Sequence, residues 1–172
     1  MEETIKIPED RLGVLIGSNG KVKRELQAKT STIIEIDSEL GEVTCSGEGE
    51  NFFKALDIIK AIGRSFSPER AFTLLKEDYL LKIVELREYV GTNESAQKAK
   101  RGRVIGRQGQ ARKNLEQKTN SLISVQGKTV AIIAKINDIE AATDAVVALL
   151  GGASHDTVTN QLERRGKERF EL

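Results

Sequence analysis

Two stretches of the chain place glycines and basic side chains at a spacing that suits anion binding. The first is Ile16-Gly17-Ser18-Asn19-Gly20-Lys21, followed by Lys23 and Arg24. The second is Ile105-Gly106-Arg107-Gln108-Gly109, followed by Arg112 and Lys113. A Gly-x-x-Gly turn that opens a helix presents unpaired backbone N–H groups and the positive end of the helix dipole. Because the basic side chains add charge at the same place, the chemistry predicted is the binding of phosphates.

The two stretches belong to a long internal repeat. Gly17 and Gly106 are 89 residues apart, and so are Thr30 and Thr119. This period exceeds the roughly 20–50 residues of a solenoid repeat. The sequence therefore predicts two copies of one small domain.

Hydrophobic periodicity predicts the same elements around each glycine turn. In the first copy we expect a strand at 4–7, a helix at 11–16 capped by Asp10, a helix at 21–29, strands at 32–37 and 42–46, and a helix at 51–65. In the second copy we expect a strand at 79–89, a basic run at 98–103 that forms or extends the first helix, a helix at 110–118, strands at 121–125 and 129–134, and a helix at 138–150 capped by Asp138. The polar residues 91–99 have no counterpart in the first copy. A helical linker begins at Ser67-Pro68, and a last helix covers about 156–165.

Aliphatic side chains next to each turn can line a groove for bases while phosphates lie on the turn. These are Ile16, Ile33 and Ile34 in the first copy, and Ile105, Leu122 and Ile123 in the second.

The charge of the chain is segregated although its net value is only +1. Basic residues dominate 98–118 and 11–29, whereas acidic residues collect at 35–50 and 69–88. Such segregation gives local positive potential at both glycine turns. The single cysteine, Cys45, excludes an intrachain disulfide and is expected to be a buried apolar side chain. With no apolar run near the ~20 residues of a membrane span, a cytoplasmic protein is expected.

Enzyme motifs are missing from the sequence. Val22 stands where a nucleotide-binding P-loop needs Ser or Thr, and no Gly-x-Gly-x-x-Gly occurs. His155, the only histidine, has no ligand partner at metal-binding spacing and is expected at the surface or as a cap. We therefore expect no catalysis, no cofactor and no metal.

The Gly-x-x-Gly turns and their surroundings resemble those of KH domains, which clamp about four nucleotides of single-stranded nucleic acid. More closely, the chain resembles the archaeal form of the Pno/Dim family of small-ribosomal-subunit assembly factors. The motifs are those at 16–21, 67–71, 101–109 and 149–151. The resemblance implies an α+β fold with two type I KH domains in tandem (β-α-α-β-β-α each). Their three-stranded antiparallel sheets would pack on helices, with domains at 1–66 and 79–152, a helical linker at 67–78, and a C-terminal helix and tail at 153–172.

The family resemblance also implies a ligand: single-stranded (precursor) 16S rRNA near its 3′ end. It implies cooperation with the endonuclease that trims that end; another ribosome-assembly or initiation factor is the alternative protein partner that we consider. The RNA contacts it implies in the second domain are Arg103, Ile105, Gly106, Arg107, Gln108, Gly109, Arg112 and Lys113. Eukaryotic relatives have a degenerate first turn, but Gly17, Ser18, Asn19 and Gly20 are intact here, so Lys21 and Arg24 join the candidates. We expect the second turn to be the main RNA site, because its two middle residues are Arg-Gln where the first turn has Ser-Asn.

The sequence also allows two other functions. One is a protein-interaction adaptor, with secondary RNA contact, that recruits a nuclease or translation factor through the first domain and the C-terminal helix. The other is a general mRNA-binding KH regulator. No exposed apolar stripe is evident in the sequence, so a monomer is expected.

Overall fold

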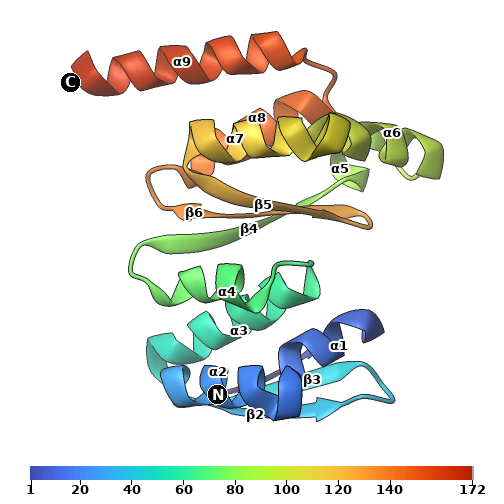
Figure 1. Cartoon of the computed structure of the whole chain (residues 1–172), viewed down its shortest axis with the longest axis vertical. Coiled ribbons are helices and arrows are strands. Elements are labelled where there is room, and N and C mark those ends of the chain that lie inside the picture. The colour runs from blue at the N-terminus through green and yellow to red at the C-terminus, as the bar shows by residue number, and fades with distance from the viewer. Residues whose placement is uncertain (172) are drawn as a thin grey trace. The chain divides into compact units, whose positions relative to one another are not determined.

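The computed structural model describes residues 1–171 and divides the chain into two compact units (Figure 1). Unit 1 comprises Met1–Glu77 and unit 2 comprises Asp78–Leu172, of which all but the last residue is described. Each unit contains the β-α-α-β-β-α order that the sequence predicts, so the expected fold class is confirmed.

Unit 1 is a three-stranded antiparallel sheet with helices on one face. Its elements are β1 (Glu2–Lys6), α1 (Glu9–Ile16), the 3-10 turn η1 (Ser18–Gly20), α2 (Lys21–Thr30), β2 (Ile33–Asp37), β3 (Glu42–Ser46) and α3 (Gly49–Gly63). The strand order β1-β3-β2 places β3 in the centre and leaves β2 at an edge, next to α2. Because side chains alternate along a strand, Ile34, Val43 and Cys45 point to the helices and are buried.

The segment after α3 continues unit 1. Ser67 caps the short helix α4 (Pro68–Ala71) by accepting the Arg70 N–H at 3.3 Å, with Pro68 at its first position, as expected. The 3-10 turn η2 (Phe72–Leu75) follows, and both elements contact α3. Lys29 of α2 lies 5.2 Å above the Phe72 ring, a cation–π contact. The residues predicted to form a linker are therefore packed onto the first unit.

Unit 2 repeats this plan with additions. Its elements are β4 (Tyr79–Glu85), α5 (Arg87–Val90), α6 (Glu94–Ile105), η3 (Arg107–Gly109), α7 (Gln110–Thr119), β5 (Ser121–Gln126), β6 (Thr129–Lys135), α8 (Ile139–Leu150) and α9 (His155–Glu171). The strand order β4-β6-β5 makes β6 central and β5 an edge. The core includes Val84, Leu115, Ile123, Ile132 and Val146.

Unit 2 carries ten extra residues between its first strand and its glycine turn. The strand residues Ile5 and Val84 hold matching register positions 79 residues apart, whereas the turns are 89 residues apart. The extra residues form α5 and the first turn of α6, which Asn93 caps by accepting the Ala96 N–H at 3.0 Å. The prediction of one strand over 79–89 is therefore wrong: the strand ends at Glu85, and Leu86 turns the chain into α5.

Two predicted helix caps are also wrong. Asp10 lies inside the first turn of α1, whose N-cap is Pro8. Asp138 stands at the N-cap of α8 but makes no capping bond. Its Oδ1 accepts instead from Arg169 of α9 at 2.9 Å, because α9 runs on to Glu171 rather than ending near residue 165. Val158 of α9 is buried and Leu162 packs against the same core.

Candidate nucleic-acid interface

The two glycine turns have the same backbone geometry. In unit 2, Gly106 has φ +73°, Gln108 has φ +54° and Gly109 has φ +72°. In unit 1, Gly17, Asn19 and Gly20 have φ of +75°, +52° and +75°. In both turns the last glycine donates its N–H to the first glycine's carbonyl, at 3.3 Å in unit 2 and 3.2 Å in unit 1. The repeat seen in the sequence is therefore a repeat in backbone conformation.

The first glycine of each turn is required by both conformation and space. A Cβ on Gly106 would lie 2.5 Å from the Cβ of Ala111, and one on Gly17 would lie 2.5 Å from Cγ2 of Val22. Both distances are far below van der Waals contact, and positive φ already disfavours a side chain. Each turn therefore lies so close to the helix that follows it that a side chain at the first glycine would not fit.

The turns leave the N-termini of α2 and α7 without side-chain caps. Gly20 and Gly109 are the N-cap residues, and neither helix has an acidic residue in its first turn. The first N–H groups of a helix have no partner inside the helix, and its dipole makes them electropositive. This end of each helix is therefore suited to a phosphate oxygen.

The middle residues of both turns point to solvent. Ser18 and Asn19 in unit 1, and Arg107 and Gln108 in unit 2, are exposed. Within residues 1–171 the side chains of Arg107 and Lys113 have no bonded partner, and Lys113 is also exposed on α7. The second turn therefore offers two uncommitted positive charges beside its helix N-terminus.

Unit 1 arranges its basic residues differently. Arg24 of α2 donates from Nη1 to the carbonyl of Asn19, and this guanidinium lies 2.9 Å from where a Cβ on Gly20 would be. Arg24 thus fastens the first turn to α2, while Lys21 remains exposed at the start of the helix.

The side chain of Arg103 is bonded to the C-terminal end of α8. Its guanidinium donates to the carbonyls of Leu149, at 2.9 Å, and Ala153, at the C-terminal end of α8. Its own carbonyl lies 2.8 Å from Nε2 of His155, at the start of α9. Arg103 therefore ties α6 to the end of α8, and we leave it out of the proposed phosphate site.

Arg11 does the same in unit 1, and the sequence reasoning missed it. Its Nε donates to Ile62 at 2.8 Å and its Nη2 to Phe66 at 2.7 Å, both carbonyls at the end of α3. The two arginines do not align in the 89-residue register, so the repeat gave no signal for this role.

The predicted apolar groove needs correction. Ile33 and Ile34 are neighbours on one strand, so they face opposite sides of the sheet; Ile33 is 63% exposed and Ile34 only 1%. Ile123 is likewise a core residue, and Leu122 points the other way. Of the predicted groove residues, Ile16 and Ile105 are partly buried directly before the turns.

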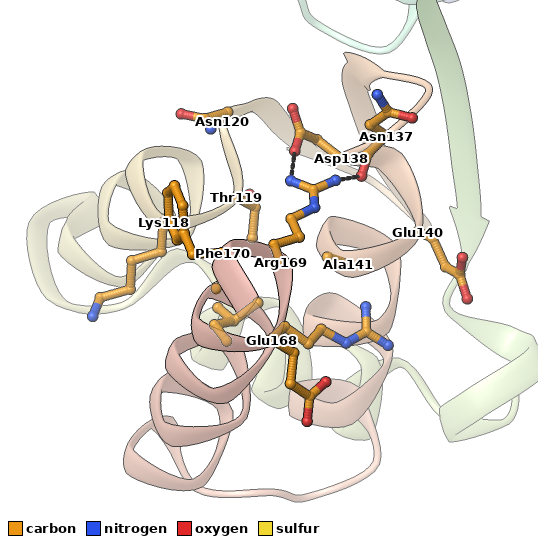
Figure 2. A pocket seen from close by; sticks show the side chains of 13 residues that line it. Lys118, Thr119, Asn120, Asn137, Asp138, Glu140, Ala141, Glu168, Arg169 and Phe170 are labelled. Atoms are coloured by element: carbon orange, nitrogen blue, oxygen red, sulfur yellow. Dashed lines mark hydrogen bonds and ion pairs between the residues drawn. The ribbon is translucent and has the colours of Figure 1, made fainter. Parts of the chain in front are cut away.

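A separate pocket of about 490 Å³ in unit 2 is not suited to phosphate. It lies between the end of α9 and residues of α7 and α8, and Figure 2 shows Arg169 reaching Asp138 and Asn137 across it. The cations near it are paired with carboxylates: Arg169–Asp138 at 2.9 Å, Arg165–Asp144 at 2.7 Å and Lys118–Glu163 at 3.7 Å. These pairs hold α9 on unit 2 rather than attract a ligand.

The described residues do not favour a metal site or a cysteine nucleophile. Residues 1–171 contain no group of three or more His, Cys, Asp and Glu side chains that would hold a metal ion. Burial raises the pKa of the Cys45 thiol, which suits the predicted apolar core residue and not a nucleophile. No helix in the same residues has the length and apolar character that crossing a membrane requires.

Comparison with protein families identifies both units. A KH-domain model matches residues 2–61, and a model described as the eukaryotic type KH domain, type I, matches residues 80–167. The chain belongs to the KH family. Its two KH domains are those that the glycine turns predict.

Individual relatives of this KH protein extend the match over the whole chain. A KH domain-containing protein of Methanocaldococcus jannaschii is 40% identical over 99% of this chain and 78% of its own. A chain in the crystal structure of an a/eIF2alpha–aDim2p–rRNA complex from Pyrococcus horikoshii matches with a TM-score of 0.91 and 44% identity, covering 98% of this chain and 95% of that one. The pre-rRNA-processing protein pno1 of Aspergillus fumigatus is 27% identical over 68% of this KH protein and 48% of its own length. The resemblance to the Pno/Dim family is therefore confirmed.

Proposed function

We propose that this KH protein binds single-stranded RNA without catalysis during small-ribosomal-subunit biogenesis. Its target is the (precursor) small-subunit rRNA near the 3′ end. The homologous aDim2p structure contains rRNA, and a more distant relative is a pre-rRNA-processing protein, which supports an rRNA ligand. We further propose that the protein acts as a cytoplasmic monomer.

One observation carries the proposal. In each unit, an uncapped helix N-terminus follows a Gly-x-x-Gly turn whose two middle side chains are exposed. A nucleic-acid backbone laid on the turn would accept hydrogen bonds from these N–H groups, as in the KH mode of binding.

The second KH domain is proposed as the main clamp. Its proposed contacts are Gly106, Arg107, Gln108, Gly109, Lys113 and the neighbouring Ile105, with Arg112 treated below. Arg107 and Lys113 are uncommitted, whereas Arg24 in the first domain is bonded to its own turn. The first domain contributes Gly17, Ser18, Asn19, Gly20 and Lys21 as a weaker clamp.

A second candidate function is a protein adaptor, favoured by the outer face of the first sheet. Glu2, Glu35 and Asp37 project from this face and are exposed, and Glu42 is partly exposed beside them. An acidic surface disfavours RNA and suits a basic protein surface. The partner proposed there is an rRNA-trimming endonuclease or another assembly or initiation factor. In the homologous complex, a/eIF2alpha is present together with aDim2p.

The test is the affinity for single-stranded RNA from the 3′ end of the small-subunit rRNA, compared with scrambled RNA of equal length. The native chain is measured beside Arg107→Asp/Gln108→Asp and Ser18→Asp/Asn19→Asp. These changes put carboxylates where phosphates would lie and leave the glycines in place. We expect a loss of at least tenfold in the 107/108 variant and a smaller loss in the 18/19 variant.

The matched control is Gln161→Asp/Arg164→Asp on α9, which makes the same change in net charge on exposed side chains outside the turn. Its affinity should stay within about twofold of native. Equal binding by native and 107/108 variant chains, or no preference for the rRNA end, would favour the adaptor function or a general RNA regulator instead.

A further inference from the structure

We propose that Arg112 contacts a nucleobase rather than a phosphate, and that Glu116 holds it there as a positioning residue. The pair would then determine the base preference of the second KH domain. The inference rests on the proposed function and assigns a task to two residues of the same site.

Arg112 reaches from the glycine turn to the edge strand. Its Nη1 lies 3.0 Å from Oε1 of Glu116 and 3.4 Å from the carbonyl of Ile123 on β5. Its Nη2 lies 4.0 Å from the position that a Cβ on Gly109 would occupy. The guanidinium therefore lies between the phosphate position and the strand edge, where the bases of a strand held by the turn would point.

The edge of β5 at this position is occupied by the same pair. Since β5 is an edge strand, alternate backbone groups point away from β6. The Ile123 N–H donates to Oε1 of Glu116 at 2.8 Å, and the Ile123 carbonyl faces Arg112. A base approaching this edge would therefore meet the guanidinium and carboxylate before it meets the strand's backbone.

The burial and charge of the pair suit short-range recognition. The Arg112 side chain is 25% exposed and that of Glu116 is 15% exposed. The adjacent carboxylate offsets the positive charge that would attract a phosphate from a distance. What remains is a planar group with oriented N–H donors, which can stack on a base or bond to its edge.

The first KH domain lacks this arrangement at equivalent positions. Gln27 accepts the Ile34 N–H at 2.7 Å, as Glu116 does for Ile123, but Gln27 carries no charge. Lys23 stands where Arg112 stands and has no bonded partner within residues 1–171. An ammonium group is a point charge without a plane, so we expect no matching base preference in unit 1.

Unit 1 supplies the test substitutions, Arg112→Lys and Glu116→Gln. Each copies a side chain that the first domain already accommodates, and Glu116→Gln keeps the acceptor for Ile123. Affinity is measured for short RNAs that differ only in the base next to the clamped phosphates, over several salt concentrations. Arg112→Lys should lower affinity about tenfold for the preferred base and less than threefold for the others, with an unchanged salt dependence.

Glu116→Gln should reduce the differences in affinity among the four RNAs and make binding more salt-dependent. Both effects are expected because Arg112, without the carboxylate, is free to contact a phosphate. The inference is wrong if Arg112→Lys weakens all four RNAs equally, changes none of them, or alters the salt dependence alone. Loss of binding in Arg107→Asp/Gln108→Asp, with base preferences unmoved in Arg112→Lys, would overturn this inference and leave the proposed function standing. Absence of RNA binding by the native chain would overturn both this inference and the proposed function.

Discussion

The hydroxyls of Thr119 and Ser121 lie 2.6 Å apart in the interior of unit 2. Thr119 Oγ1 also donates to the Leu115 carbonyl at 2.6 Å, so its oxygen must accept the Ser121 proton. Thr30 and Thr32 form the same pair at 2.7 Å in unit 1. Between the two hydroxyls the chain leaves the helix through a residue with positive φ, Asn120 or Ser31. The repeated segments 30–32 and 119–121, each with a hydroxyl side chain at both ends, therefore encode the passage from the helix after the turn to the edge strand.

Thr119→Val should destabilise unit 2 by about 1–3 kcal/mol, because it leaves the buried Ser121 hydroxyl without its acceptor. Thr119→Ser keeps the hydroxyl and should lose less than half as much. Native-state amide exchange of the central strand β6 measures the free energy of opening of unit 2. A larger loss in Thr119→Ser than in Thr119→Val would mean that the methyl group, and not the hydroxyl pair, stabilises this passage.

Two glycines of one helix-turn segment should respond in opposite directions to alanine. Gly106→Ala places a Cβ 2.5 Å from that of Ala111 at positive φ, so we expect a loss of stability above about 1 kcal/mol and loss of RNA binding. Gly102→Ala, inside α6 with no heavy atom within 4 Å of the new Cβ, should stabilise by about 0.5–1 kcal/mol. Thermal unfolding and RNA titration of both variants test this. A folded, RNA-binding Gly106→Ala chain would show that the turn does not need its present shape.

Substitutions of Arg103 and Arg107 should affect different properties: the first should lower stability and the second should lower RNA affinity. Arg103→Gln removes the donors to Leu149 and Ala153 and should cost about 1–3 kcal/mol, with RNA affinity within twofold of native. Arg107→Gln, at an exposed site, should leave stability within about 0.5 kcal/mol and lower RNA affinity several-fold, with a shallower salt dependence. The opposite pattern, in which Arg103→Gln is as stable as native but binds RNA poorly, would mean that Arg103 is part of the RNA clamp.

Asp57 on α3 gives a pH-dependent prediction. Burial raises the pKa of this carboxyl, Lys60 opposes the shift, and Glu3 adds to it. The folded chain therefore holds the proton more tightly than the unfolded chain, and stability falls as pH rises through the raised pKa. Asp57→Asn should stabilise unit 1 relative to native at pH 7 and lose this advantage near pH 3. A stability difference that does not change between these two pH values would contradict it.

The sequence predicted the repeat, the element order and the positions of the two glycine turns, because these depend on local signals. Glycine at positive φ, alternating β-branched residues and helix periodicity are all visible along the chain. The roles of Arg11 and Arg103 depend on contacts with residues 51 and 46 positions away, and no local pattern reports such contacts. The sequence shows the ten-residue insertion as polar residues without a counterpart, but its two helical pieces depend on Leu86 and Gln97 being buried.

The groove was the least accurate prediction from sequence. Ile33 and Ile34 are equally apolar, and only the register of β2 against β3 decides which one faces the helices. Arg112 is expected from the sequence as an RNA contact, but its pairing with Glu116 at the strand edge is a tertiary property that no local pattern reports.

The most direct test of the account follows backbone amide resonances of the full chain while single-stranded RNA from the small-subunit rRNA 3′ end is added. The account predicts the largest shifts at Gly106 to Ala111, smaller shifts at Gly17 to Val22, and a shift at Ile123 where the base would lie. Shifts confined to the acidic outer face of the first sheet, around Glu35 and Thr44, or an absence of shifts at both glycine turns, would contradict the clamp.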